Sequence, residues 1–272
     1  MNEYIKRQHQ NSVKPADLCD WLVSHGIATI SSQECAHLFG VPREEVPQRM
    51  VRLRKKGHFV ALARGLWVAV PAEYREMQAP DPMHYIDDLM SFYGCDYCVG
   101  WLSAAALQGA RQQAPQVFQL AANKMLRNRV IGRSRLQFFD RSYVSKITRR
   151  RITISSGRAY VASPGTTMLM AASDPVQCGG IDNTATIITE LAEENTEYRE
   201  DILKDAPLFS DTAVRRLGWI LEHVAGEDSL DALAKYCERA NTPALLLSDG
   251  RRSGSIDRRW NIIINREIEA DI

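Results

Sequence analysis

Cationic side chains gather between Arg43 and Arg64, where seven Lys and Arg residues stand against two Glu residues. A helix over residues 44–56 turns by about 100° per residue, so it has an apolar row and an opposite polar row. The apolar row is Val46, Met50 and Leu53, and the polar row is Gln48, Arg52 and Lys55, flanked by Arg49 and Lys56. A basic helix fits the major groove of B-DNA, which is about 12 Å wide. The candidate DNA-binding residues are Arg43, Gln48, Arg49, Arg52, Lys55, Lys56 and Arg64.

The neighbouring segments predict the elements that would position this helix. "PADLCDWLVSHG" has apolar residues at helical spacing and a Gly at its end, and "ISSQECAHLFG" begins with a capping box made of Ser31 and Glu34. Pro47 fits the first turn of the basic helix. Two strand-like runs, "HFVAL" and "LWVAV", then flank a turn with Arg64 at its tip. This order predicts a winged helix-turn-helix, and the alternative is a three-helix interaction module that binds no nucleic acid.

Prolines at 71, 80 and 82 interrupt the periodicity and indicate a connector, so the sequence predicts a DNA-binding domain over 1–79 and a larger domain over 80–272. In the second domain, "DYCVGW", "QVFQLAA", "RLQFFD", "RITIS" and "RAYVAS" read as strands of a mixed sheet. "LSAAALQG" reads as a helix capped by Ser103. Four further helices follow Gly165, and "WNIIIN" reads as a last strand. The predicted fold class is α+β, with a mixed sheet and a helical C-terminal part.

The composition indicates a soluble globular chain: 272 residues, 45% hydrophobic and 25% charged. The start has no signal-peptide core, and no apolar run reaches the ~18 residues of a membrane helix. We therefore expect a cytoplasmic protein that does not contact a membrane. The six cysteines have no framework spacing, so we expect reduced thiols and no disulfide.

Charge is distributed unevenly along the second domain. Residues 124–158 carry eleven Lys and Arg residues against one Asp, and residues 182–211 carry nine acids against two cations. The basic stretch, centred on Lys146, Arg149, Arg150 and Arg151, favours contact with a phosphate-bearing or acidic partner. The alternative is that the acidic stretch folds back and neutralises it.

No catalytic constellation is predicted. Cys95 and Cys98 lack a second pair for zinc and lie in a strand, so they fit core sulfur better than a metal or redox site. Ser163 to Thr167 could present backbone N–H groups to phosphate, but the stretch lacks a P-loop Lys and is better explained as a helix cap. The six histidines show no metal-binding spacing. We expect no enzyme activity, no metal and no cofactor.

Five segments, in this order and spacing, resemble the AbiEi-type antitoxins of type IV toxin-antitoxin systems. They are "GLWVAVP" (65–71), "YCVGWLSAAALQGARQQAPQVFQL" (97–120), "AYVASPGTTMLMAASDPVQCGGI" (159–181), "RRLGWILE" (215–222) and "WNIIINREIE" (260–269). One departure is Gly165, which stands where the family pattern leads us to expect a Glu just before Thr166.

The resemblance implies a bifunctional protein of an abortive-infection, or phage-defence, system. Residues 1–79 would bind inverted repeats of double-stranded DNA in the promoter of the protein's own operon and repress transcription. Residues 80–272 would form the antitoxin domain and oppose a nucleotidyltransferase-like toxin without a stable complex, and Lys146, Arg149, Arg150 and Arg151 are the candidate antitoxin surface. We expect a monomer that binds DNA cooperatively. A ligand-responsive winged-helix regulator and a nucleic-acid-processing enzyme remain alternatives.

Overall fold

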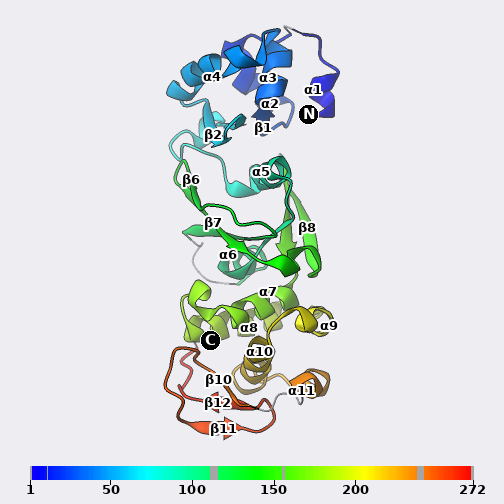
Figure 1. Ribbon diagram of the computed structural model, residues 1–272, viewed down its shortest axis with the longest axis vertical. Coiled ribbons are helices and arrows are strands. Elements are labelled where there is room, and N and C mark those ends of the chain that lie inside the picture. The colour runs from blue at the N-terminus through cyan, green and yellow to red at the C-terminus, as the bar shows by residue number, and fades with distance from the viewer. Residues whose placement is uncertain (1, 11, 111–115, 155–156, 238–241, 271–272) are drawn as a thin grey trace.

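The computed structural model describes residues 2–10, 12–110, 116–154, 157–237 and 242–270. Three parts follow one another along the molecule: an N-terminal unit of helices with a small sheet, a six-stranded sheet, and a helical layer that carries a second small sheet (Figure 1). The mixture of helices with parallel and antiparallel strands confirms the predicted α+β class.

The N-terminal unit, residues 2–70, combines short helices with a three-stranded antiparallel sheet. Its helices are α1 (Glu3–Lys6), α2 (Leu18–Ser24), α3 (Ser32–Phe39) and α4 (Val46–Lys55), and its strands are β1 (Thr29–Ser31), β2 (Phe59–Ala63) and β3 (Leu66–Ala69). β3 lies between β1 and β2. This helix order and strand pairing are compatible with the predicted winged helix-turn-helix, which stays a prediction, and the hairpin of β2 and β3 is called the wing below.

Local signals explain where these helices begin and end. The side chain of Ser31 accepts a hydrogen bond from the backbone N–H of Glu34, whose carboxylate accepts one from the backbone N–H of Ser31 at 2.8 Å. This is the predicted capping box. α3 ends at Gly40, whose left-handed backbone (φ 62°) suits glycine. Pro47 lies in the first turn of α4, where a missing N–H leaves no helical hydrogen bond unmade.

Strand β3 is buried on both faces. Trp67 and Ala69, together with Phe59 of β2, pack into the core of the N-terminal unit. Leu66 and Val68 pack instead into a second core that continues through the six-stranded sheet and the helical layer. Because successive side chains of a strand point to opposite faces, the wing joins the two cores.

A connector, residues 71–85, contains two short 3-10 helices, η3 (Ala72–Tyr74) and η4 (Pro82–His84). The large sheet packs directly on it through the turn at Gly132 and the start of β9: a Cβ at Gly132 would lie 2.6 Å from the Met77 carbonyl oxygen, and one at Gly157 would lie 2.8 Å from the His84 carbonyl oxygen. The predicted boundary near residue 80 falls in this connector. It stays a prediction, because side chains on both sides of it share one core.

The central sheet has the strand order β6-β7-β5-β4-β9-β8. Its strands are β4 (Tyr97–Val99), β5 (Val117–Ala122), β6 (Arg129–Ile131), β7 (Ser134–Asp140), β8 (Arg149–Ile154) and β9 (Gly157–Ala162). The pairs β5–β7 and β4–β9 are parallel, and the other pairs are antiparallel. Helices α5 (Ile86–Tyr93) and α6 (Trp101–Leu107) flank this sheet. The expected mixed sheet is therefore present, with β6 and β8 as its edges.

The helical layer packs on the sheet through α7, which is buried along its length. Its helices are α7 (Pro164–Ser173), α8 (Ile181–Glu194), α9 (Tyr198–Asp205), α10 (Asp211–His223) and α11 (Asp231–Cys237). The side chain of Ser163 accepts a hydrogen bond from the backbone N–H of Thr166, as the predicted helix cap requires. The layer ends in a small sheet of β10 (Ala244–Leu245), β12 (Ile262–Ile264) and β11 (Ser255–Asp257), in that order.

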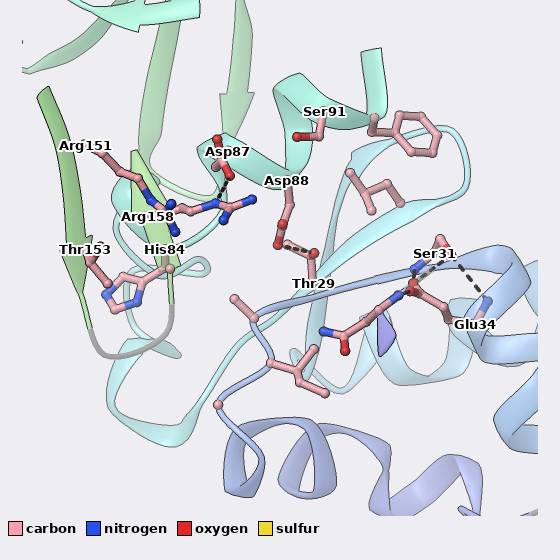
Figure 2. A pocket seen from close by; sticks show the side chains of 17 residues that line it. Thr29, Ser31, Glu34, His84, Asp87, Asp88, Ser91, Arg151, Thr153 and Arg158 are labelled. Carbon is pink, nitrogen blue, oxygen red and sulfur yellow. Dashed lines mark hydrogen bonds and ion pairs between the residues drawn. The ribbon is translucent and has the colours of Figure 1, made fainter. Parts of the chain in front are cut away.

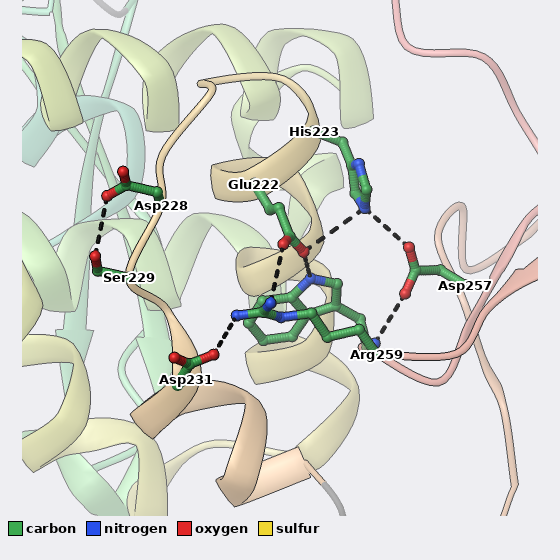
Figure 3. Close-up of polar contacts among 8 residues, drawn as sticks. Glu222, His223, Asp228, Ser229, Asp231, Asp257 and Arg259 are labelled. Carbon is green, nitrogen blue, oxygen red and sulfur yellow. Dashed lines mark hydrogen bonds and ion pairs between the residues drawn. The ribbon is translucent and has the colours of Figure 1, made fainter.

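The C-terminal end of α10 fixes this small sheet through a polar network (Figure 3). His223 Nε2 lies 2.8 Å from Asp257 Oδ2, and Glu222 accepts a hydrogen bond from the indole N–H of Trp260. The Trp260 ring covers Gly218, where an added Cβ would lie 2.0 Å from a ring carbon. Glycine at 218 therefore lets β12 approach α10 closely.

The predicted helix cap at Ser103 was wrong. α6 begins at Trp101 after Gly100, and Ser103 lies inside the helix, where it is buried. Its hydroxyl donates to the Val117 carbonyl (3.2 Å) and accepts from the Gln119 N–H (2.9 Å), so it ties α6 to β5. Helices α1, α5 and α9 and strands β1, β6, β10 and β11 were not predicted. In the described part of the chain, no helix is long and apolar enough to cross a membrane.

Candidate nucleic-acid interface

Helix α4 presents to solvent a row of three polar residues and one valine. Val46, Met50 and Leu53 are buried in the N-terminal core, which fixes the rotation of the helix about its axis. The opposite row is Gln48, Val51, Arg52 and Lys55, all exposed. Val51 is 46% exposed and was not predicted as part of this row. Its neighbours could donate hydrogen bonds to guanine or phosphate, and its methyl groups could contact a thymine methyl.

The flanking cations of α4 differ in how free they are. Arg49 forms an ion pair with Glu45, one helical turn earlier, at 3.0 Å, and both side chains are partly exposed. Arg43 lies in the 3-10 helix η2 (Arg43–Glu45) just before α4, and Lys56 caps its C-terminal end; both are exposed. Arg43 and Lys56 therefore suit phosphate contacts beside the row, whereas Glu45 already holds Arg49.

A basic groove of about 740 Å³ adjoins the C-terminal end of α4. Arg54, Lys55 and Lys56 line one side, and Arg75 of the connector lines the other. Arg75 belongs to the predicted connector and was not predicted as a DNA-binding residue, because only the fold brings it beside α4. The groove extends the positive surface of α4 toward the connector.

The wing is covered by protein beside its turn. Arg64 itself is exposed at the turn. Its neighbours Leu62 and Leu66, however, are buried in the second core, and Arg129 of β6 donates a hydrogen bond to the Leu62 carbonyl at 2.9 Å. The central sheet therefore covers the strands beside the wing tip, which leaves the Arg64 side chain as the accessible part of the turn.

A cleft of about 570 Å³ lies between the N-terminal unit and the central sheet (Figure 2). The Thr29 hydroxyl donates to Asp88 of α5 across it at 2.6 Å. On its other wall Asp87 pairs with Arg158 at 2.5 Å, and Arg151 reaches in from the edge strand β8. Protein atoms of the cleft surround the Asp88 carboxyl, although part of the side chain remains in contact with solvent. The loss of water around the carboxyl raises its pKa.

The basic stretch 124–158 is divided by the fold. Its first half lies on β6, β7 and their connections, and its second half on β8, the turn before it and the start of β9, at the opposite edge of the sheet. One sequence block thus becomes two separate positive regions. Charged edge strands are also a common protection against edge-to-edge pairing.

The predicted antitoxin residues are split once more, between two faces of β8. Arg149 and Arg151 share one face; Arg149 donates to the Tyr97 carbonyl at 2.8 Å and stacks on Tyr160. Arg150 has the opposite face and pairs with Glu197 at 3.1 Å. Lys146 is exposed in the turn before β8. Arg150–Glu197 is thus an ion pair that joins the basic stretch to the acidic stretch 182–211.

The Gly165 departure has a packing reason. A Cβ at this position would lie 2.3 Å from the Tyr198 carbonyl oxygen and 2.9 Å from the Ile202 nitrogen, because α9 rests on the first turn of α7. A Glu there would displace α9. The buried carboxylate of Asp205, at the end of α9, accepts hydrogen bonds from the Thr166 hydroxyl (2.6 Å) and the Thr148 N–H (2.7 Å).

The two candidate redox cysteines belong to the interior. Cys98 is fully buried on β4, Cys95 is half-buried, and burial raises the pKa of both thiols, which disfavours the reactive thiolate. Within the described residues, no group of three or more His, Cys, Asp or Glu side chains is arranged to hold a metal ion.

Comparisons with known proteins agree with this architecture. The chain shares its fold with the RV2827C protein from Mycobacterium tuberculosis, whose crystal structure superposes with a TM-score of 0.67 over 94% of this chain and 92% of that one, at 11% sequence identity. No protein of curated function matches the sequence. Residues 98–223 match the family model of the AbiEi antitoxin C-terminal domain. The match spans the central sheet from β4 onward and the helical layer through α10, so this part of the chain is similar to the C-terminal domain of AbiEi antitoxins.

Proposed function

We propose that this protein is an AbiEi-type antitoxin that binds the promoter of its own operon through α4 and represses transcription. The proposal rests mainly on an exposed row of α4, while the opposite face of this helix is buried in the core. The row is Gln48, Val51, Arg52 and Lys55. Arg43, Lys56 and the groove cation Arg75 extend the positive surface to either side. A recognition helix works in this way: phosphate contacts position it, and a few side chains read base edges.

The wing takes a smaller part in this proposal. Arg64 is free to reach a phosphate, but the strands beside it are held by the central sheet. Because the wing belongs to both cores, DNA bound to α4 is also held in a fixed orientation to the antitoxin domain. We propose that the protein is a monomer when it is not bound to DNA. Two copies then bind the two inverted repeats cooperatively, and each copy carries its own antitoxin domain.

The test is binding of the full chain to its own promoter, measured by fluorescence anisotropy, together with a promoter-reporter assay. The Arg49→Ala/Arg52→Ala double variant is expected to lose both specific binding and repression. A matched control is Arg133→Ala/Arg135→Ala, which removes two exposed cations from the sheet edge that carries β6 and β7. If Arg49→Ala/Arg52→Ala still binds the promoter, or if Arg133→Ala/Arg135→Ala loses promoter binding, α4 is not the element that recognises the promoter sequence.

The antitoxin half of the proposal is that the β8 edge opposes a nucleotidyltransferase-like toxin. Arg151 faces the cleft and Lys146 is exposed in the preceding turn, whereas Arg149 and Arg150 already have protein partners. Co-expression of the toxin with Lys146→Ala/Arg151→Ala is expected to abolish growth rescue while repression persists. Arg150→Ala, on the opposite face, is the control that should keep rescue. Full rescue by a folded Lys146→Ala/Arg151→Ala protein would refute this surface.

The interdomain cleft favours a second candidate, a regulator that responds to a small ligand. Polar groups from both units converge there, and a ligand bridging Thr29 and Asp88 would alter how the units are held together. The discriminating measurement is repression of a promoter reporter in cells without the toxin gene. Repression that changes with growth conditions, and stops changing in Asp88→Asn, would favour the ligand-responsive reading.

A further inference from the structure

A pocket of about 510 Å³ lies at the N-terminal end of α10, far along the chain from α4 and the β8 edge. One wall is the first turns of α10, and the other is the segment that carries β10. The side chains that matter for its chemistry are Thr212, Arg215, Arg216, Ser248 and Arg252. The motif "RRLGWILE" begins at these two consecutive arginines, which no role described above uses.

Arg216 carries a buried charge without a contacting carboxylate. It is 1% exposed and donates to the carbonyls of Leu246 (2.8 Å), Leu245 (3.2 Å) and Ala172, and to the Ser248 hydroxyl at 2.6 Å. All of these partners are neutral. Burial accordingly lowers the pKa of Arg216 to about 10. Asp174, which opposes this shift from a distance, is itself paired with Arg141.

Arg215 adds a second buried charge with a donor left over. It is 5% exposed, and its Nη1 donates to the carbonyls of Thr242 (2.8 Å) and Asn261 (3.2 Å). Its Nε has no hydrogen-bond partner among the described residues, although it is shielded from solvent. Buried N–H groups are nearly always paired in folded proteins, so an unpaired one beside a pocket indicates a missing acceptor.

The remaining lining favours an anionic acceptor. Arg252 is exposed at the pocket and donates to the Pro243 carbonyl at 3.0 Å, and Thr212 and Ser248 supply hydroxyls. Asp211 is the acidic residue of the lining, so three guanidinium groups face one carboxylate. Guanidinium groups match the geometry of phosphate oxygens, and the first turn of a helix also favours an anion.

We propose that this pocket binds the phosphate groups of a nucleotide. A volume of about 510 Å³ exceeds what a lone phosphate needs and falls in the usual range for small-molecule sites. The phosphates contact Arg215 and Arg252 at the pocket, and Arg216 supplies positive charge from behind while holding the β10 segment in place. This site goes beyond the DNA-binding proposal and shares no residue with α4, so failure of one leaves the other standing.

The test uses the full chain and isothermal titration calorimetry at constant ionic strength with pyrophosphate, a nucleoside triphosphate and the matching nucleoside. We expect the two phosphate compounds to bind and the nucleoside to give no heat. Arg252→Ala, which removes the exposed guanidinium, is expected to weaken binding about tenfold, in line with the loss of a charge-assisted contact. Arg251→Ala is the matched control, because this neighbouring arginine does not line the pocket.

Arg215→Lys keeps the charge but removes the planar donor edge, and it should weaken triphosphate binding while circular dichroism shows a folded protein. Absence of phosphate binding at millimolar concentrations would overturn the proposal. Equal weakening by Arg251→Ala and Arg252→Ala would do so as well, because it would mean diffuse attraction to surface charge. Binding of triphosphate and nucleoside with the same affinity would show that the phosphates are not what the pocket recognises.

Discussion

The arginines of α4 and those of α10 are the same residue type in opposite environments. Arg52 and Arg54 stand in solvent on a helix whose apolar side alone is fixed, whereas Arg215 and Arg216 are almost fully buried and hydrogen-bonded to carbonyls. A solvated cation contributes little to stability but can exchange water for a phosphate freely. A buried one is part of the fold, so any ligand it meets must reach it through a pocket.

The largest expected effect comes from substituting the buried member of this comparison. Arg216→Met keeps much of the side-chain volume but leaves three carbonyls and the Ser248 hydroxyl without their donor. We expect the free energy of unfolding to fall by ~3 to 5 kcal/mol, because buried acceptors lose charge-assisted hydrogen bonds. Urea unfolding followed by circular dichroism measures it.

Arg54→Met on exposed α4 is the matched substitution and should stay within ~0.5 kcal/mol of the wild type. Unchanged or increased stability in Arg216→Met would reverse the comparison. It would mean that desolvation of the charge outweighs its hydrogen bonds, as happens in some buried ion pairs.

The next largest effect is expected on DNA binding, from substitution of the exposed Arg52 of α4. Arg52→Ala should weaken binding to the native promoter by ~1 to 3 kcal/mol if Arg52 contacts a guanine edge, and should lower discrimination against unrelated DNA. Lys56→Ala, at the end of the same helix, should weaken both DNAs about equally because it meets phosphate. Competition titrations with promoter and unrelated duplexes separate the two. Equal losses for both DNAs in Arg52→Ala would show that this residue also meets only the backbone.

Features of α3, α4 and α7 that depend on nearby residues could be predicted from the sequence, whereas sites built from distant segments could not. The capping box of α3, the apolar row of α4 and the cap at Ser163 were predicted because each depends on residues within one or two helical turns. The pocket beside Arg215 was not, since its walls come from segments about 30 residues apart that meet only after folding. The density of positive charge along the chain predicted a single basic surface at residues 124–158. The central sheet instead places these residues at two opposite edges.

The wing shows a signal that was available in the sequence. "LWVAV" is apolar at every position, whereas a wing with one face in water would alternate apolar and polar residues. Burial of β3 on both faces follows from that pattern. The short strands β10 and β11 offered no comparable pattern, and the polar sequence of α9 resembled a solvated segment, although Tyr198 and Ile202 are buried.

A smaller effect is expected at the wing tip, which is intermediate in the comparison: an exposed cation on a covered hairpin. Arg64→Ala should change the free energy of unfolding by no more than ~0.5 kcal/mol. If Arg64 meets one phosphate, the slope of log affinity against log salt concentration should become shallower by about 0.9. Promoter titrations at several salt concentrations give the slope. An unchanged slope would assign DNA binding to α4 and the adjoining groove alone, and early melting would make Arg64 structural.

The smallest expected effect tests whether freeing a solvated cation strengthens DNA binding. Glu45 holds Arg49 at 3.0 Å, so Glu45→Gln should release Arg49 toward DNA and also remove a negative charge near the phosphates. Exposed ion pairs are worth ~0.2 to 1 kcal/mol, so we expect a gain in promoter affinity of that order.

Glu44→Gln removes the same charge one residue earlier, where no ion pair is present among the described residues. The gain of Glu45→Gln over Glu44→Gln therefore measures the release of Arg49, and raising the salt concentration should shrink it as screening weakens both the pair and the phosphate contact. Equal gains in the two variants would mean that only net charge matters and that Arg49 contacts no phosphate.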